Sequence, residues 1–218
     1  MGWLLIGLLL LATPAWAEPF LDLGLGATKF FPTVPEGSWW QEPFPHSFGT
    51  TDFAWRAGLG WRFNEHWSVA GSYIDMGAAT SRELQVLDIE HNFATRSCIA
   101  NCTRPFDVRV RSPLHGPELS VKYTWPFAIL SPFVRVGGAW VHNKTTWSVL
   151  NNTPDRDTGP GGTLEQSFLM ALGGVGVCYR WVCAEATYYE GRHFGADNGF
   201  TIATNALVSM MSLNVPLW

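Results

Sequence analysis

The stretch that decides the fold runs from Phe53 to Gly77 and reads FAWRAGLGWRF, then NEH, then WSVAGSYIDMG. Its first part alternates bulky apolar residues with alanine, glycine and arginine, a two-residue period that only a strand can use. Asn64–His66 supplies a tight reversal, and the second part alternates again, from Trp67 to Tyr73. The stretch therefore predicts an antiparallel hairpin with one aromatic face and one face of small residues carrying a few charges.

Alternation alone does not decide which face meets water, since a soluble barrel buries its apolar face and a membrane barrel turns it outward. Two details favour the membrane. Side chains such as Phe53, Trp55 and Trp61 are too bulky for the narrow interior of a small barrel. The opposite face also has glycine and alanine between its charges, whereas a solvated face would be polar at nearly every position. We therefore expect the aromatic face to contact lipid.

The chain begins with a targeting segment. Trp3–Leu11 is continuously apolar and is followed by Pro14 and then Ala15-Trp16-Ala17, the small-residue pattern of a signal-peptidase site. We expect residues 1–17 to be a signal peptide cleaved after Ala17, and residues 18–218 to form the barrel domain. No Lys or Arg precedes the apolar run, and a buried N-terminal helix is the alternative reading.

The composition agrees with an exported membrane barrel. Of 218 residues, 15% are charged and 14% aromatic, and the formal net charge of −4 gives no indication of nucleic-acid binding. No apolar run after residue 17 is long enough for a membrane helix. A transmembrane barrel hides its hydrophobicity in this way, because only alternate residues contact lipid.

Period-two segments predict eight antiparallel strands in an up-and-down transmembrane barrel. The expected strands are Pro19–Phe31, 53–63, 67–77, Leu114–Trp125, Leu130–Trp147, Leu164–Tyr179, Val182–Glu190 and Phe200–Trp218. Ala78–Ser112 is expected to be the longest irregular stretch, with ends that extend the neighbouring strands beyond the membrane. Long and short connections alternate, as in bacterial outer-membrane barrels with short periplasmic turns and long external loops. For two expected strands, the glycine-rich Leu164–Tyr179 and the last one, the sequence does not decide which side chains face outward.

The four cysteines fall in two local pairs, Cys98 with Cys102 and Cys178 with Cys183. An exported protein meets an oxidising compartment, so we expect two disulfides. A metal site is the rival interpretation, but no histidine partners lie at ligand spacing, and we expect neither a metal nor another cofactor.

Tryptophans mark the expected strand ends. Aromatic rings with one wet edge settle at the headgroup level of a bilayer, whereas plain core packing would be the alternative. The predicted aromatic girdle comprises Trp61, Trp67, Trp125, Trp140 and Trp181.

Three segments resemble the OmpA-like outer-membrane β-barrel family. Residues 63–77 resemble the family's second-to-third strand signature, and residues 20–30 resemble its glycine-rich first strand. The terminal Trp218 resembles the aromatic signal read by the barrel-assembly machinery, which would then be a partner. The resemblance implies an eight-stranded transmembrane barrel in the bacterial outer membrane without a peptidoglycan-binding domain.

The candidate site is a network of charges on the small-residue face, which a barrel encloses. Its predicted members are Arg56, Glu118, Lys122, Arg135 and Glu185. Buried charges must pair or cost several kcal/mol each, so a salt-bridge plug with an architectural role is the favoured interpretation. A polar gate for small solutes, in the manner of a porin, is the alternative.

An enzyme is the third interpretation, since Ser, His and a carboxylate near a barrel rim can hydrolyse lipids. His193, Asp197, Ser167 and Ser212 are the residues available for it, but no nucleophile motif surrounds them, so we expect no catalytic residues. Surface binding is the remaining possibility. The expected loops carry Trp39, Trp40 and Phe44 and could contact lipopolysaccharide or another extracellular ligand.

Overall fold

The computed structural model describes residues 17–32, 46–88, 103–127, 129–150, 162–191 and 203–217, and every regular element in them is a β-strand. The strands are β1 (Glu18–Pro32), β2 (His46–Gly49), β3 (Thr51–Arg62), β4 (Trp67–Asp88), β5 (Thr103–Thr124), β6 (Ser131–Leu150), β7 (Gly162–Tyr179), β8 (Val182–Glu190) and β9 (Ala203–Pro216). These described ranges contain no helix with the length and hydrophobicity of a membrane span.

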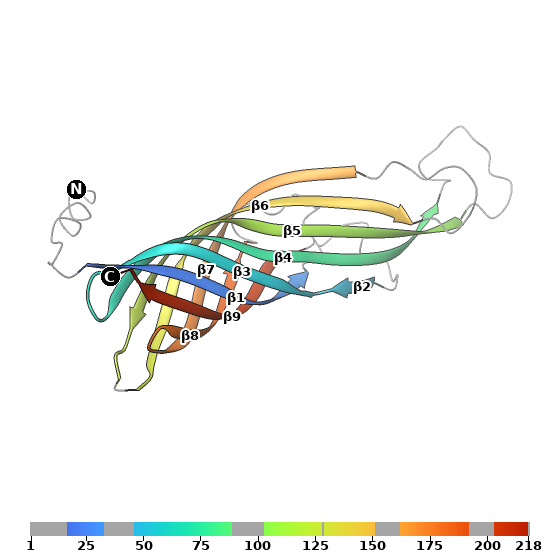
Figure 1. Ribbon diagram of the computed structural model, residues 1–218. Coiled ribbons are helices and arrows are strands. Elements are labelled where there is room, and N and C mark those ends of the chain that lie inside the picture. The colour runs from blue at the N-terminus through green and yellow to red at the C-terminus, as the bar shows by residue number, and fades with distance from the viewer. Residues whose placement is uncertain are drawn as a thin grey trace.

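The strands form one antiparallel sheet that closes on itself (Figure 1). Its order is β2-β4-β3-β1-β9-β8-β7-β6-β5, and the pairing of β4 with β5 completes the ring. Both β2 and β3 pair with β4, at successive positions along it, so together they form one wall of the barrel. The predicted closed barrel of eight antiparallel strands is confirmed. Closure matters because it leaves no strand edge without a hydrogen-bonded neighbour around the barrel body.

Short turns gather at one end of the barrel, where the chain also enters and leaves it. The turns after β3, β5 and β7 are short, and Phe20 of β1 pairs with Pro216 of β9 beside them. Figure 1 shows β1 beginning and β9 ending at this end. Residues 33–45, 89–102, 151–161 and 192–202, which connect strands at the opposite end, lie outside the described residues.

The segment from Ala78 to Ser112 is more regular than predicted, and its ends extend the neighbouring strands as expected. β4 continues to Asp88 and β5 starts at Thr103, and the two pair up to Asp88 with Thr103. The cause lies in a second alternation that the charged residues obscured, since Val110 is buried while Arg109 and Arg111 are exposed. As a result β4, β5, β6 and β7 extend past the barrel body (Figure 1).

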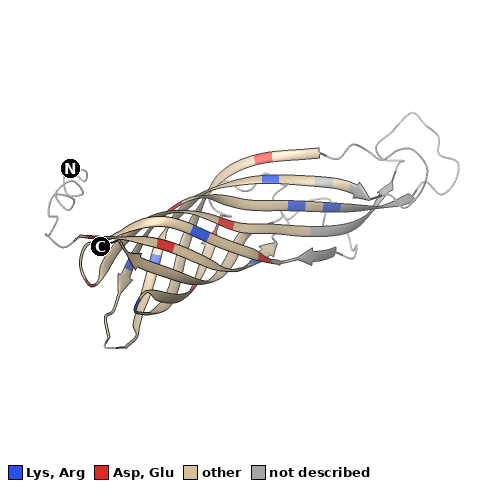
Figure 2. Ribbon diagram, viewed as in Figure 1, with Lys and Arg blue, Asp and Glu red and all other residues tan. Residues whose placement is uncertain are grey.

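The outer face of the barrel body is apolar, as the alternation predicted. On β3 the outward side chains run from Phe53 to Trp61, and on β7 from Leu169 to Tyr179. These stretches have the length of about 9–11 residues with which a tilted strand crosses a bilayer. Figure 2 shows how sparsely charges occur on this part of the ribbon.

The five tryptophans of the predicted girdle all point outward, with exposures between 39% and 58%. Trp67 and Trp125 lie at the short-turn end, where their rings pack edge-on against Tyr123 at 4.8 and 4.9 Å. The wall therefore carries an aromatic cluster at this edge, the place where rings with a wet side are stabilised in a bilayer.

The structure also gives the facing of the two strands that the sequence left open. Even-numbered residues of β7, such as Phe168 and Met170, are buried inside, and their odd-numbered neighbours are exposed. On β9, Met210 and Ser212 are inside while Met211 and Leu213 are exposed.

A β-bulge in β4 sits where its apolar outer face ends. The register with β5 shifts between Asp75 and Ala78, and Gly77 has a φ of 75°. Asp75 accepts a hydrogen bond from the Gly77 amide at 2.8 Å, and Asp52 of β3 accepts one from the Ala78 amide at 2.7 Å. A Cβ on Gly77 would lie 2.6 Å from the Phe53 carbonyl oxygen. Bulges of this kind re-aim a strand, and only glycine fits this one without strain.

We predict that Gly77→Ala lowers the free energy of unfolding by about 1–2 kcal/mol, because alanine is strained at positive φ and meets backbone there. Gly71→Ala is the matched control, since its Cβ would meet nothing within 4 Å. Denaturant unfolding of the two variants in micelles, followed by tryptophan fluorescence, measures the difference. Equal stability of the two variants would contradict this account of the bulge.

Candidate functional site

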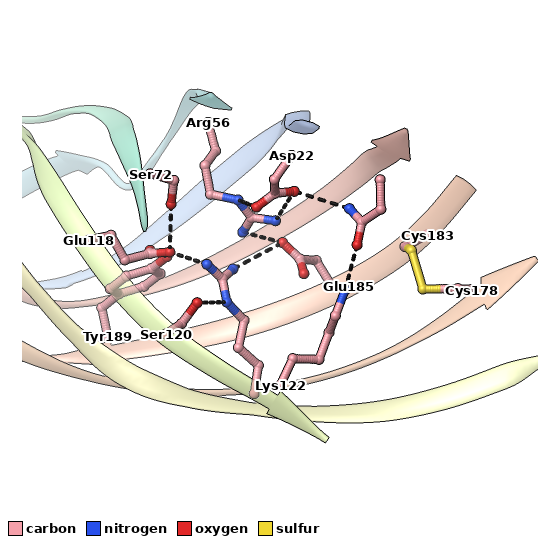
Figure 3. A network of polar contacts seen from close by, with 12 residues as sticks. Asp22, Arg56, Ser72, Glu118, Ser120, Lys122, Cys178, Cys183, Glu185 and Tyr189 are labelled. Atoms are coloured by element: carbon pink, nitrogen blue, oxygen red, sulfur yellow. Dashed lines mark hydrogen bonds and ion pairs between the residues drawn. A yellow bond between two sulfur atoms is a disulfide. The ribbon is translucent and has the colours of Figure 1, made fainter. Parts of the chain in front are cut away.

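Six charged side chains from five strands meet inside the barrel (Figure 3). The site consists of Asp22 of β1, Arg56 of β3, Glu118 and Lys122 of β5, Arg135 of β6 and Glu185 of β8. Each occupies an inward position of its strand, the parity on which the sequence places small residues. We call this group the lumen network.

Arg56 joins two of the carboxylates. Its Nε and Nη2 donate to the two oxygens of Asp22 at 3.0 and 3.2 Å, a bidentate arrangement, and its Nη1 contacts Glu185. Charge-assisted bidentate pairs are stronger and more directional than neutral hydrogen bonds. Arg56 therefore ties β1 and β8 to β3 through the interior.

Arg135 makes the second bridge. Its Nη2 contacts Glu118, its Nη1 lies 3.5 Å from the same Glu185 oxygen that Arg56 binds, and its Nε donates to Ser120 at 2.9 Å. Glu118 also accepts hydrogen bonds from Ser72 at 3.1 Å and from the Tyr189 hydroxyl at 2.5 Å. Glu185 is thus shared between both guanidinium groups, which makes the network continuous.

Lys122 closes the network on the side of the short turns. Its ammonium donates to Asn214 at 2.5 Å, and Asn214 in turn donates to Asp22 at 3.1 Å. The same ammonium lies 5.6 Å from the ring centre of Phe20 and 5.0 Å from that of Phe133. Aromatic faces at this distance partly replace the hydration that a buried cation loses.

The lumen network is balanced in charge and leaves little room for water. Three cations face three carboxylates, and the five that are most enclosed are no more than 8% exposed. The hollow beside the network is about 10 Å³, on the order of what one water molecule needs. With so little water available, the mutual contacts must offset the desolvation of the charges.

Apolar layers lie on both sides of the lumen network along the barrel axis. Towards the short turns, Phe133 packs with Cys178 and Cys183. Towards the opposite end, the interior is filled by a cluster that includes Ile74 and Met210. The remaining members of that cluster are Phe30, Ala54, Met76, Ala79, Leu114, Ala139, Val141, Phe168, Met170, Leu172, Tyr189, Ala206 and Val208. The expectation that charges fill the lumen was therefore incomplete, because they occupy one layer of a mostly apolar interior.

The structure brings together all five residues predicted for the network and adds others. Asp22 shares its parity with Gly24 and Gly26, which is the signal that could have identified it. Tyr189 and Asn214 were missed for different reasons. The alternation of β8 does place Tyr189 inside, where it is fully buried, but an uncharged ring gives no signal of a network member. Asn214 lies on β9, whose facing the sequence left open.

The second cysteine pair forms a disulfide, Cys178–Cys183, which joins β7 and β8 across their two-residue turn. Cys98, Cys102 and Trp218 lie outside the described residues, so the first disulfide and the terminal assembly signal stay predictions. Within the described residues, no group of three or more His, Cys, Asp or Glu side chains is arranged to hold a metal ion.

Of the residues considered for catalysis, the two serines lie on opposite faces of the wall. Ser212 is buried inside the barrel, whereas Ser167 is exposed on the outer face. His193 and Asp197 lie outside the described residues. Ser167 does contact the Nδ1 atom of His142 at 2.7 Å, but a nucleophile and base also need a group that orients the base.

We predict that Arg135→Ala destabilises the barrel by about 3–5 kcal/mol, because it leaves Glu118 and Glu185 buried with reduced compensation. Arg62→Ala is the control, since Arg62 pairs with Glu18 at 3.5 Å at the short-turn ends of β3 and β1, where both side chains are about half exposed, and such pairs contribute about 0–1 kcal/mol. Denaturant unfolding in micelles would measure both. A loss for Arg135→Ala no larger than for Arg62→Ala would show that the network does not hold the barrel together.

Comparisons with known proteins give likenesses of structure only. No family model and no curated protein matches this sequence. Among solved structures, the chain is similar to the N-terminal β-barrel domain of Pseudomonas aeruginosa OprF, with 11% identity, coverage of 92% of this chain and 98% of that one, and a TM-score of 0.43.

Two further likenesses have the same character. Neisserial surface protein A shows 12% identity, 93% and 99% coverage and a TM-score of 0.45. The outer membrane protein OprG of P. aeruginosa shows 12% identity, 92% and 97% coverage and a TM-score of 0.45. Scores this low carry no argument about function. The closed ladder of this chain itself shows an eight-stranded antiparallel β-barrel, in which β2 and β3 together form one wall against β4.

Proposed function

We propose that this protein is an integral barrel of the bacterial outer membrane with a closed lumen and a structural or surface-interaction role. The single observation that carries the proposal is the position of the lumen network, which lies between two apolar layers inside a wall whose outer face is apolar. The proposal has three parts, namely membrane insertion, closure and the use of the loop end.

Membrane insertion is supported by the outer face. Leu25, Leu119, Val136 and Val175 belong to four different strands, and each is between 59% and 63% exposed. Apolar side chains that surround a barrel form a far larger patch than a soluble monomer exposes. Lipid is the environment in which such a surface is stable, and the closed ladder satisfies the backbone that lipid cannot hydrogen-bond.

Closure is supported by the interior. Conduction of a solute requires a continuous path lined by groups that replace its hydration. Here the apolar cluster around Ile74 and Met210 lies in series with the paired charges, so a solute would have to cross both. The paired guanidinium and carboxylate groups also have their hydrogen bonds committed to each other. A porin-like channel is therefore the less favoured function.

The third part of the proposal, the use of the loop end, goes together with export. The segment of residues 1–17 would direct export and be cleaved after Ala17, and Trp218 would be read by the barrel-assembly machinery. The loop end would face the outside, where outer-membrane lipid, lipopolysaccharide and an extracellular ligand are the partners. We assign no catalytic role, because the serines considered for one lie on opposite faces of the wall.

The test of closure is conductance in planar lipid bilayers, after a heat-modifiability gel has shown that the sample is folded. We predict no discrete current steps above those of lipid alone, because the apolar and charged layers leave no continuous aqueous path. An open porin of known conductance, reconstituted in the same lipid, is the positive control. Reproducible steps that scale with the amount of folded protein would contradict the proposal.

A further inference from the structure

Beyond the apolar belt, the outer face of β5 and β6 becomes polar and basic. Going away from the short turns, the outward side chains of β5 change from apolar Leu119 to His115, and those of β6 change from Trp140 to His142. We propose that this region binds the phosphate groups of lipids in the outer leaflet. We call it the basic wall, and its members are Arg109, Arg111, His115, His142 and Lys144. The inference rests on the membrane placement given under the proposed function.

The strand register places these residues side by side. His115 pairs with His142, which pairs with Ser167 of β7. Arg111 and Arg109 lie further along β5, opposite Thr146 and Ser148 of β6, and all four are exposed. The members of the basic wall thus occupy one continuous patch on neighbouring strands.

The two imidazole rings are held at the edge of the belt by neighbours on the same surface. The Tyr73 hydroxyl lies 2.5 Å from Nδ1 of His115, and the Ser167 hydroxyl lies 2.7 Å from Nδ1 of His142. The ring centres are 6.1 Å apart. A surface hollow of about 340 Å³ opens beside them, and both histidines, Lys144 and Ser167 are among its lining residues.

The charge of the patch favours an anion. Figure 2 shows basic bands on β5 and β6 past the barrel body and an acidic band on β7. The patch has three cations, Arg109, Arg111 and Lys144. Two carboxylates lie on the same face, those of Glu165 and of Asp75, the partner of His115 on β4. Guanidinium groups match phosphate oxygens in a bidentate manner, and lysine binds phosphate as a point charge. Cations at a membrane surface attract anionic headgroups.

Glu165 competes with a phosphate for Lys144. The Lys144 ammonium lies 2.7 Å from the Glu165 carboxylate, and this hydrogen bond lowers the pKa of Glu165 below its ordinary value. Both side chains are more than half exposed, so the pair can exchange partners without a buried charge being left behind. Removal of the Glu165 charge should therefore strengthen phosphate binding, whereas removal of the Lys144 charge should weaken it.

A lipid fits this site better than free phosphate because the acyl chains have a surface of their own. On the short-turn side of the basic wall, the outer face carries Leu119 of β5, Trp140 of β6 and Leu169 of β7, which are 41–63% exposed. A ligand with both a phosphate and hydrocarbon chains contacts the basic wall and this apolar surface at once, whereas inorganic phosphate contacts only the basic wall.

The test is a titration of folded barrel in neutral-detergent micelles with bis-phosphorylated lipid A, with bound lipid counted by native mass spectrometry. The variant carries Arg109→Gln, Arg111→Gln and Lys144→Gln. We expect it to bind at least tenfold more weakly than wild type, because three headgroup contacts are lost. A control with Lys29→Gln, Arg62→Gln and Arg180→Gln makes the same change in net charge elsewhere and should bind within twofold of wild type.

Glu165→Gln provides a second reading that does not depend on the stability of the triple variant, with an expected gain in affinity of about threefold or more. Equal binding by the two triple variants would overturn the inference, as would a Glu165→Gln variant that binds no better than wild type. Binding of dephosphorylated lipid A as tight as that of the phosphorylated form would show an apolar site. Full competition by millimolar inorganic phosphate would show a free-phosphate site. A barrel that conducts ions but passes these tests would refute closure and leave the inference standing.

Discussion

The structure depends on one constraint, which is that a backbone placed in hydrocarbon has no water to hydrogen-bond. A sheet meets the constraint only by closing, and here the ladder between β4 and β5 completes the ring. Once the wall is closed, the pleat assigns each side chain to the outer face or to the interior. Leu119 and Val121 point out, and Glu118 and Ser120 between and beside them point in. The charged interior and the apolar exterior are therefore two results of one arrangement.

The narrow interior determines what the enclosed charges can do. A barrel of this size has little room beyond its own side chains, and glycines provide part of that room. A Cβ on Gly60 would lie 2.2 Å from the Phe20 ring, and one on Gly176 would lie 2.4 Å from the Phe133 ring. These two rings in turn flank the Lys122 ammonium. The glycine-rich parity of the strands thus makes space for inward aromatic rings, which cover the short-turn side of the lumen network.

Much of the fold follows from the sequence because the period of two is strong where both faces are distinct. The span Val182–Glu190 matches β8 in full, and the five predicted lumen charges all lie inside. The pattern fails where a residue breaks the rule that bulky side chains face out. The alternation does place Tyr189 inside, where its hydroxyl reaches Glu118. Towards the end opposite the short turns, however, the bulky side chains of Phe30, Phe168 and Met170 fill the interior where small residues were expected. The extensions of β4 and β5 were expected only at the ends of the segment, because alternating arginines there resemble a loop composition.

The central claim is that the bulky face of every strand contacts lipid. Nitroxide labels introduced at Leu25, Leu119, Val136 and Val175, which are exposed on four strands, would test it directly in reconstituted vesicles by their collision rates with oxygen and with a water-soluble nickel chelate. The account predicts high oxygen and low nickel accessibility at all four positions, and the reverse at Thr146 on the extension of β6. High nickel accessibility at the four positions would place this face in water and contradict the account.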